Sequence, residues 1–133
     1  MNRDPKTPAA SAIVSARAPR PLGPYPHARR LGNLLFLSGI GPRHRVTEQI
    51  PEGIEAQTRA CIENVKAILE DAGSALEKVV DVTVFLTNID RDFAAFNRVY
   101  GEYFDAIRPT RTTVGVVALP VPISVELKII AES

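Results

Sequence analysis

The stretch IEAQTRACIENVKAILEDAGSALEKVVDVTVFL, residues 54–86, decides the fold because its apolar pattern changes period halfway along. In the first part, apolar side chains recur every three or four residues, at Ile54, Cys61, Ile62, Val65, Ile68, Leu69 and Ala72. This spacing predicts an amphipathic helix, and Gly73 suits the position just after its end. Residues 79–86 form a β-branched run instead, which predicts a central strand.

The strand predicted at residues 79–86 has one strongly apolar face. By the two-residue period of a strand, that face carries Val80, Val82, Val84 and Leu86. Helices are expected on only one face of the sheet, and these valines are too apolar to face water on the other. A partner subunit is the simplest cover, so the strand predicts an oligomer.

A second helix is predicted to begin at Asp90 or Asp92, because either side chain can cap the free N–H groups of the first turn. Its buried side is marked by aromatic residues, and Pro109 closes the unit. These aromatic residues are Phe93, Phe96, Tyr100 and Phe104.

Further strands are predicted on both sides of this helix–strand–helix unit. They lie at residues 34–38, 112–117 and 123–131, and residues 42–53 form a loop with room for a brief edge strand. The order predicts an α+β domain with two helices on one face of a mixed sheet. Residues 12–133 are expected to form this single domain, and the Pro- and Ala-rich residues 1–11 a disordered tail.

Composition limits the classes of function. The 133 residues fit one domain, and 16 Lys+Arg against 15 Asp+Glu give a net charge of +1, so nucleic acid and membrane are unexpected partners. One local basic cluster is the exception, formed by Arg17, Arg20, Arg29 and Arg30. Cys61 is the single cysteine, no Cys/His spacing indicates a metal site, and no stretch is long enough to span a membrane. These features predict a cytoplasmic protein without a metal or disulfide.

Two charged residues stand out because they lie in apolar strand-like sequence near the C-terminus. Arg111 could bind a carboxylate in a bidentate manner, and Glu126 could orient a water or take up protons. An ordinary ion pair between neighbouring strands is the competing interpretation. Gly39, at the end of an apolar run, lacks a Cβ and could let a ligand approach the main chain.

Several motifs resemble the reactive intermediate deaminase family (RidA/YjgF), in that family's order and over residues 13–131. They are Leu22–Ala28, Leu35–Gly39, Ile54–Arg59, Glu63–Leu69, Val80–Thr87 and Pro109–Val114.

The resemblance implies a chorismate-mutase-like fold, a homotrimer with a central β-barrel, and active sites between subunits, with no cofactor or metal. It implies that Arg111 binds the substrate carboxylate and that Glu126 assists a water that hydrolyses an imine or enamine to a carbonyl and ammonia. It also places five further residues in the cleft, namely Tyr25, Ser38, Gly39, Asn97 and Thr113.

Residues 40–45 and 119–128 depart from the common family pattern, and are similar to 2-aminomuconate deaminases, which form 4-oxalocrotonate. That substrate carries two carboxylates, so a second cation is expected: Arg43, or alternatively Arg45 or His27. A broad-specificity deaminase of 2-iminobutanoate and 2-iminopropanoate is the first alternative. A ligand- or RNA-binding protein without catalysis, which would use the arginine cluster, is the second.

Overall fold

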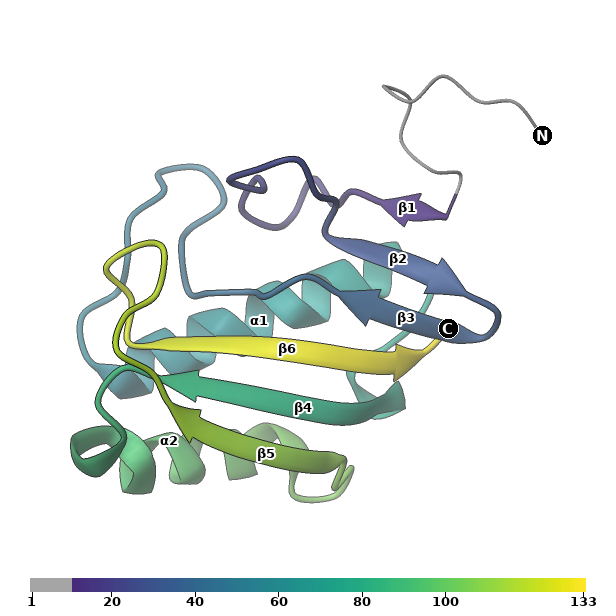
Figure 1. Cartoon of the computed structure of the whole chain (residues 1–133). Coiled ribbons are helices and arrows are strands. Elements are labelled where there is room, and N and C mark those ends of the chain that lie inside the picture. Colours follow the sequence, from purple (N-terminus) through teal and green to yellow (C-terminus); the bar gives the residue numbers. More distant parts are fainter. Residues whose placement is uncertain (1–10) are drawn as a thin grey trace.

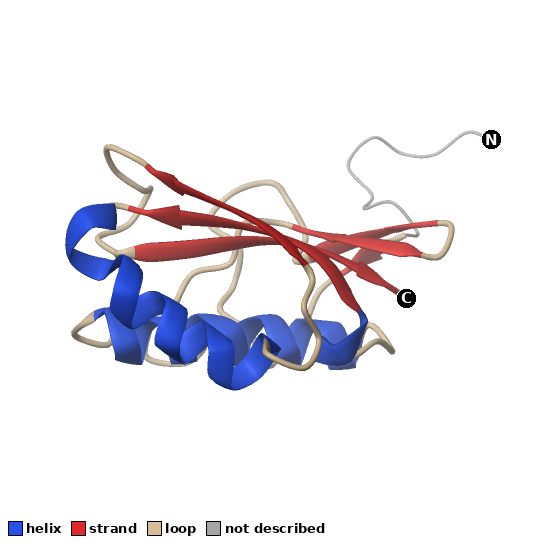
Figure 2. Ribbon diagram, turned by 90° about the horizontal axis from the view of Figure 1, so that it is seen from below, coloured by secondary structure: helices blue, strands red, loops and turns tan. Residues whose placement is uncertain are grey.

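A computed structural model describes residues 11–133, which form a mixed sheet with both helices on one face (Figure 1; Figure 2). The strand order is β1-β2-β3-β6-β4-β5, and only β4 and β5 run parallel. The six strands are β1 (Ala12–Ile13), β2 (Ala28–Leu31), β3 (Leu34–Leu37), β4 (Val79–Leu86), β5 (Thr110–Gly115) and β6 (Val125–Glu132).

The N-terminal tail predicted at residues 1–11 lies outside the described residues, with the exception of Ser11. The Ser11 carbonyl accepts a hydrogen bond from the backbone N–H of Arg30 at 3.0 Å, so this residue is tied to β2. The next two residues, Ala12 and Ile13, form the edge strand β1 of the sheet.

Helix α1 spans Ile54–Asp71 and agrees with the prediction. It turns its apolar side to the sheet and leaves that side fully buried at Cys61, Ile62, Val65, Ile68 and Leu69. Burying each of these large aliphatic side chains contributes about 1.5–3 kcal/mol, so packing against the sheet stabilises the helix that the apolar spacing predicts. Gly73 follows with φ +81°, a left-handed conformation that glycine adopts without strain.

Helix α2 spans Ile89–Phe104, but its N-terminal cap differs from the one predicted. The cap is Asn88, whose side-chain oxygen accepts the backbone N–H of Arg91 at 3.1 Å, rather than Asp90 or Asp92. Asparagine is as good a cap as aspartate, and Asn88 comes two residues after the end of β4 at Leu86. A short 3₁₀ helix, η1 (Leu76–Lys78), joins α1 to β4.

The apolar face of β4 is covered by the helices of the same chain. Val82, Val84 and Leu86 are fully buried there, so the prediction that these valines need a partner subunit is wrong. Val80 does not share their face: the pairing with β6 shifts register between Val79 and Asp81, and Val80 is 41% exposed. A bulge turns a side chain to the other face of the sheet because the extra residue breaks the alternation of side chains between the two faces.

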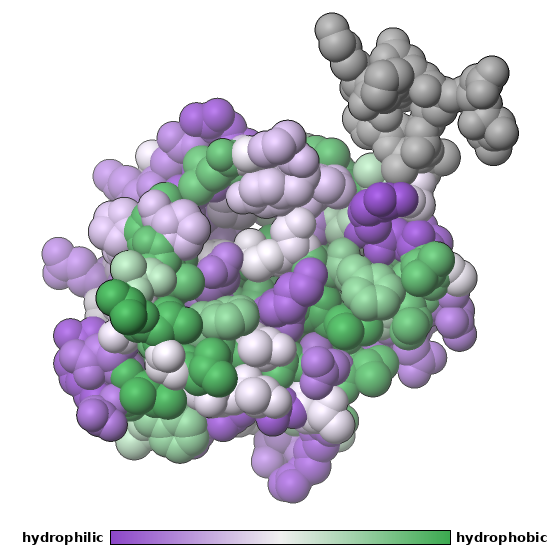
Figure 3. All heavy atoms as spheres, in the orientation of Figure 1, coloured by the Kyte–Doolittle hydropathy of each residue, from purple (hydrophilic) through white to green (hydrophobic). Residues whose placement is uncertain are grey.

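The opposite face of the sheet carries no helix (Figure 2). On it Phe36 pairs with Ile130, and Phe85 with Glu126, all half-buried. Figure 3 views the molecule from this side and shows apolar and charged side chains intermixed. This open face, and not the valine face of β4, is the surface of the sheet that the described chain leaves uncovered.

The strand boundaries near the C-terminus differ from the predicted ones. β5 begins at Thr110, opposite Asp81 of β4, and ends at Gly115; β6 begins at Val125. Residues 116–124 form a loop because Pro120 and Pro122 cannot donate ladder hydrogen bonds. Residues 42–53 contain no strand, so the brief edge strand allowed there is not formed.

Candidate functional site

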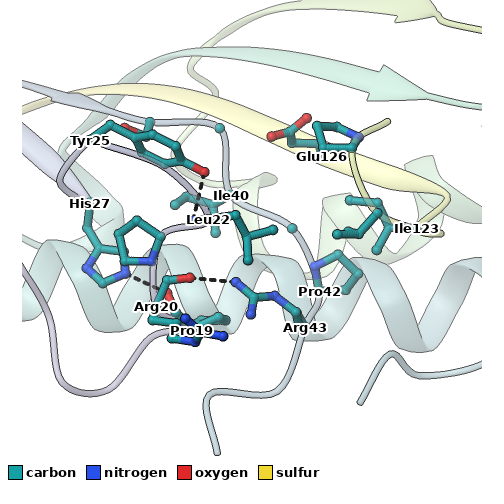
Figure 4. Close-up of a pocket in the computed structure, with 16 residues that line it drawn as sticks. Pro19, Arg20, Leu22, Tyr25, His27, Ile40, Pro42, Arg43, Ile123 and Glu126 are labelled. Carbon is teal, nitrogen blue, oxygen red and sulfur yellow. Dashed lines mark hydrogen bonds between the residues drawn. The ribbon is translucent and has the colours of Figure 1, made fainter. Parts of the chain in front are cut away.

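Loop residues around the start of β6 enclose a cavity of about 80 Å³, named here the Glu126 pocket (Figure 4). Its walls come from the Pro-rich residues 19–27, from residues 38–43 after β3, and from residues 120–126. The pocket brings together five of the predicted site residues, namely Tyr25, Ser38, Gly39, Arg43 and Glu126. Segments that are far apart in the sequence therefore meet around one cavity.

Gly39 leaves room for the Glu126 carboxylate, which lies against its main chain. A Cβ built on Gly39 would lie 2.8 Å from the carboxyl carbon of Glu126, closer than side chains tolerate. Partial burial raises the pKa of the Glu126 carboxyl above its usual value, since desolvation disfavours the charged form. A raised pKa makes this carboxylate a stronger base than an exposed one, as uptake of a proton from water requires.

Tyr25 and Ser38 border the pocket and are both held by the Pro-rich loop. The Tyr25 hydroxyl accepts the Leu22 backbone N–H at 3.2 Å, and the ring remains 44% exposed. Ser38 donates its hydroxyl to the Pro26 carbonyl at 2.8 Å. The hydroxyl of Ser38 thus positions the loop that carries Tyr25.

Of the candidate second cations, Arg43 lines the Glu126 pocket, but it already has partners. Its side chain is 12% exposed, pairs with Glu48 at 2.8 Å, and donates to the Arg20 carbonyl at 2.6 Å.

The other two candidate cations do not offer a free charge to the pocket. His27 is buried, and its Nδ1 accepts the Ser15 backbone N–H at 2.9 Å. Its Nε2 lies 2.6 Å from the Pro19 carbonyl, so His27 holds the loop. Arg45 is exposed and does not line this cavity.

Polar side chains of α1 fix the floor of the pocket, and sequence reasoning missed them. Asn64 donates to the carbonyls of Gly41 and Arg43 at 2.9 and 3.0 Å. Buried Gln57 accepts the Ser124 backbone N–H at 2.7 Å. The signal that could have found them is an amide side chain within the apolar stripe of an otherwise regular helix.

Arg111 lies on the edge strand β5 and points toward α2. Its guanidinium carbon lies 4.8 Å from the ring centroid of Tyr100, 5.5 Å from that of Phe96 and 5.9 Å from that of Phe93. Within residues 11–133 the guanidinium makes no ion pair and no hydrogen bond. Aromatic rings attract a cation electrostatically without neutralising it, so the charge of Arg111 remains available to an anion.

Three buried polar atoms close to this helix–strand interface have no hydrogen-bond partner in the described part of the chain: Asn97 Oδ1, the Tyr100 hydroxyl and Thr113 Oγ1. Asn97 and Thr113 were predicted site residues, and Tyr100 was predicted only as part of the helix core. Buried polar groups are nearly always paired, so such a cluster indicates a place where a ligand or another chain supplies the partners.

A hollow of about 300 Å³ opens beside Arg111, named here the Arg111 hollow. It is lined by Tyr100, Gly101, Phe104, Asp105, Arg108, Pro109 and Arg111. Burial raises the pKa of Tyr100 to about 12, with the Arg111 charge opposing and the Asp81 charge adding to the shift. The Tyr100 hydroxyl is therefore protonated and able to donate at neutral pH.

The two charged residues lie on opposite faces of the sheet. β4 separates β5 from β6; in the register Arg111 is opposite Val82, on the helix-covered face, and Glu126 is opposite Phe85, on the open face. The interpretation of Arg111 and Glu126 as an ion pair between neighbouring strands is therefore wrong. Within one chain the predicted site residues form two separate groups.

The basic cluster of the N-terminal region is largely paired within the chain. Arg17 bonds to Glu70 and Asp71, and Arg20 to Glu48. Arg30 donates to the Ala72 carbonyl at 2.6 Å, and Arg29 to the Ser11 hydroxyl. These arginines form salt bridges and caps instead of one cationic surface.

Residues 11–133 contain no group of three or more side chains able to hold a metal ion. Neither α1 nor α2, the helices of the described region, is apolar and long enough to cross a membrane.

Fold and site together define an α+β protein of the YjgF/chorismate-mutase-like type, with an arginine at a sheet edge that has no acidic partner in the part of the chain that the structure describes. The yeast protein YEO7 has this fold, with a TM-score of 0.89, 36% identity and coverage of 92% of this chain and 97% of its own. The family model described as Endoribonuclease L-PSP matches residues 15–133. The chain belongs to the RidA/YjgF/L-PSP (RutC) family, and the predicted fold is confirmed.

Two relatives are similar to this chain over most of their length. A RutC family protein of Pyrococcus abyssi is 44% identical over 124 residues, covering 92% of this chain and 97% of its own. TdcF of Escherichia coli, named as a candidate reactive intermediate deaminase, is 40% identical over 122 residues, or 90% and 94% of the two chains. A crystal structure of TdcF with bound serine matches at a TM-score of 0.86 and 38% identity, over 92% of this chain and 98% of that one.

Proposed function

We propose that this protein is a hydrolytic deaminase of 2-imino and 2-enamino carboxylates. The observation that carries the proposal is Arg111, a guanidinium held by aromatic rings and without an acidic partner in residues 11–133. A planar guanidinium binds a carboxylate through two parallel hydrogen bonds. The relative TdcF binds serine, a small molecule with a carboxylate, which supports an anionic ligand.

The proposed reaction needs few groups from the protein. The enamine tautomerises to an imine, water adds to the imine carbon, and the resulting aminoalcohol expels ammonia to leave a 2-oxo acid. Glu126 takes a proton from the attacking water and returns it to the leaving nitrogen, for which its raised pKa is suited. Arg111 fixes the carboxylate beside the reacting carbon, which mainly supplies positioning.

A complete site requires two copies of the chain, because Arg111 and Glu126 lie on opposite faces of one sheet. We infer that a homotrimer places the Arg111 hollow of one protomer against the Glu126 pocket of the next. Two features support this assembly: the open face with its half-buried Phe36, Phe85 and Ile130, and the edge strand β5. The unpaired Asn97 and Thr113 atoms would then face the shared cleft.

The substrate is the finer part of the proposal. 2-Aminomuconate carries a second carboxylate, and Arg43 is the predicted second cation that lines the Glu126 pocket with its charge. Arg43 is bound to Glu48 and to the Arg20 carbonyl, so a second carboxylate would have to replace these partners. 2-Iminobutanoate needs only Arg111, and the pocket as it stands favours this smaller substrate.

RNA binding without catalysis has less support. It would need a continuous cationic surface with phosphate contacts. The arginines of the N-terminal region bond instead to Glu70, Asp71 and Glu48.

Ammonia release from freshly generated 2-iminobutanoate and 2-aminomuconate tests the proposal. We expect turnover of 2-iminobutanoate, and Arg43→Ala should leave that rate unchanged while slowing 2-aminomuconate if Arg43 serves the second carboxylate. Absence of release from both substrates, together with an RNA affinity that falls steeply with salt, would reject the deaminase.

A further inference from the structure

The guanidinium of Arg111 is held in place by a stack of aromatic rings on α2. Tyr100 is in the middle of this stack: its ring centroid lies 5.6 Å from that of Phe96 and 4.5 Å from that of Phe104. Tyr100 is also the ring closest to Arg111, at 4.8 Å. Because Phe104 is 1% and Phe96 0% exposed, the Tyr100 ring has little freedom to move.

Aromatic rings can hold an arginine in place without occupying the N–H groups with which it binds an anion. A carboxylate at this position would orient Arg111 but would also compete with the anion that Arg111 binds. An aromatic ring attracts the guanidinium through its face and leaves the N–H groups at the edge of the plane free to donate. Asp105 is the acidic residue among those that line this hollow, and its carboxylate accepts a hydrogen bond from Arg108 at 3.3 Å and none from Arg111.

We propose that Tyr100 is the residue that positions Arg111 for carboxylate binding, through its ring face. The inference deepens the proposed function and rests on it for the identity of the ligand. Tyr100 is only 8% exposed and lines the Arg111 hollow, so the ring reaches the site although most of it lies in the core. Its buried hydroxyl, which has no partner within residues 11–133, is a second feature that a carboxylate held by Arg111 would satisfy.

Two substitutions separate the ring from the hydroxyl. Tyr100→Phe keeps the ring face and removes only the hydroxyl, whereas Tyr100→Leu removes the face. Tyr103→Leu is the matched control, since Tyr103 lies on the same helix, is half-buried and contacts Glu63 and Arg59 of α1 instead of Arg111. A loss common to both leucine variants would reflect damage to α2 and not positioning.

The first measurement concerns the free protein and does not depend on activity. The side-chain Nε–H signal of Arg111, assigned by its loss in Arg111→Lys, should be shifted upfield by ring currents in the wild type and in Tyr100→Phe. It should move toward the position of an exposed arginine in Tyr100→Leu, but not in Tyr103→Leu. An unshifted wild-type signal would overturn the inference whatever the protein catalyses.

The second measurement concerns the ligand. In steady-state deamination of 2-iminobutanoate, Tyr100→Leu should raise KM by about tenfold with a smaller change in kcat, and Tyr100→Phe should raise it by about threefold. An unchanged KM in Tyr100→Leu would overturn the inference while leaving the deaminase proposal intact. If the Arg111 signal is shifted but no deamination is observed, Tyr100 still positions Arg111 and the proposed reaction is wrong.

Discussion

The Arg111 hollow and the Glu126 pocket both hold an ionisable group, but by opposite means. Arg111 lies on an edge strand among aromatic rings that leave its charge unpaired, whereas Glu126 lies on an inner strand where burial disfavours its charge. The first arrangement suits binding of an anion and the second suits proton transfer. In the proposed reaction, carboxylate binding and proton transfer therefore depend on separate groups of residues, on the two faces of one sheet.

The largest effect is expected from Arg111→Ala. Loss of the guanidinium should lower kcat/KM for 2-iminobutanoate by about 10³-fold, since a desolvated carboxylate loses its charged partner. Arg98→Ala, which removes an exposed arginine of α2 that pairs with Glu55 of α1, should keep the wild-type kcat/KM. Near-wild-type activity of Arg111→Ala would show that the hollow does not bind the substrate.

Mixing experiments test whether the two regions act across subunits. Arg111→Ala and Glu126→Gln proteins, each nearly inactive, should regain about a quarter of wild-type activity when co-assembled at equal amounts into trimers. A shared site receives Arg111 from one copy and Glu126 from another, and one combination in four is intact. Absence of recovery in proven mixed trimers would contradict a site shared between copies.

Glu126→Gln should mainly lower kcat, by about 10²-fold, with little change in KM. The amide keeps the shape of the side chain but cannot accept a proton from water. In the wild type, kcat should fall as the pH drops through the raised pKa of Glu126, so the acid limb should lie above the ordinary value of 4.5. Glu132→Gln, at the exposed end of the same strand, is the control.

Gly39→Ala should lower kcat by about tenfold, because the added methyl group would displace the Glu126 carboxylate. Substrate binding through Arg111 should be retained, so KM should change little. The melting temperature of the variant, expected near that of the wild type, separates this local displacement from unfolding. A variant with unchanged kcat would show that the carboxylate need not lie at this glycine.

The smallest effect concerns stability. Since the folded-state pKa of Glu126 is raised, the folded protein binds more protons than the unfolded chain between 4.5 and that pKa, and stability falls as the pH rises through this interval. Glu126→Gln should therefore melt slightly higher than the wild type at neutral pH. The difference should vanish below pH 4.5, and a difference independent of pH would argue against a raised pKa.

The elements with a strong local pattern could be predicted from the sequence. The three- and four-residue spacing of α1 and the β-branched run of β4 gave the correct type of element because local preference and burial agree there. The cap at Asn88 and the start of β5 were missed since both depend on where the neighbouring strand ends. The bulge that turns Val80 outward has no marker in the sequence.

The sequence suggested the residues of a candidate site but not how they are arranged in space. Motif resemblance indicated Arg111 and Glu126, whereas their separation depends on β4 lying between β5 and β6, and strand order is not encoded in the alternation within any one strand. The role of Tyr100 was hidden for a related reason. An aromatic residue at helical spacing looks the same whether it fills a core or supports an arginine.

Cys61, the single cysteine of the chain, offers a practical consequence. It is fully buried between α1 and the sheet, its thiol donates to the Ile40 carbonyl, and burial raises its pKa. Alkylating reagents attack only exposed thiolate, so labelling can proceed only when α1 lifts away from the strands. The rate at which this one sulfur atom is alkylated therefore reports how often α1 separates from the sheet.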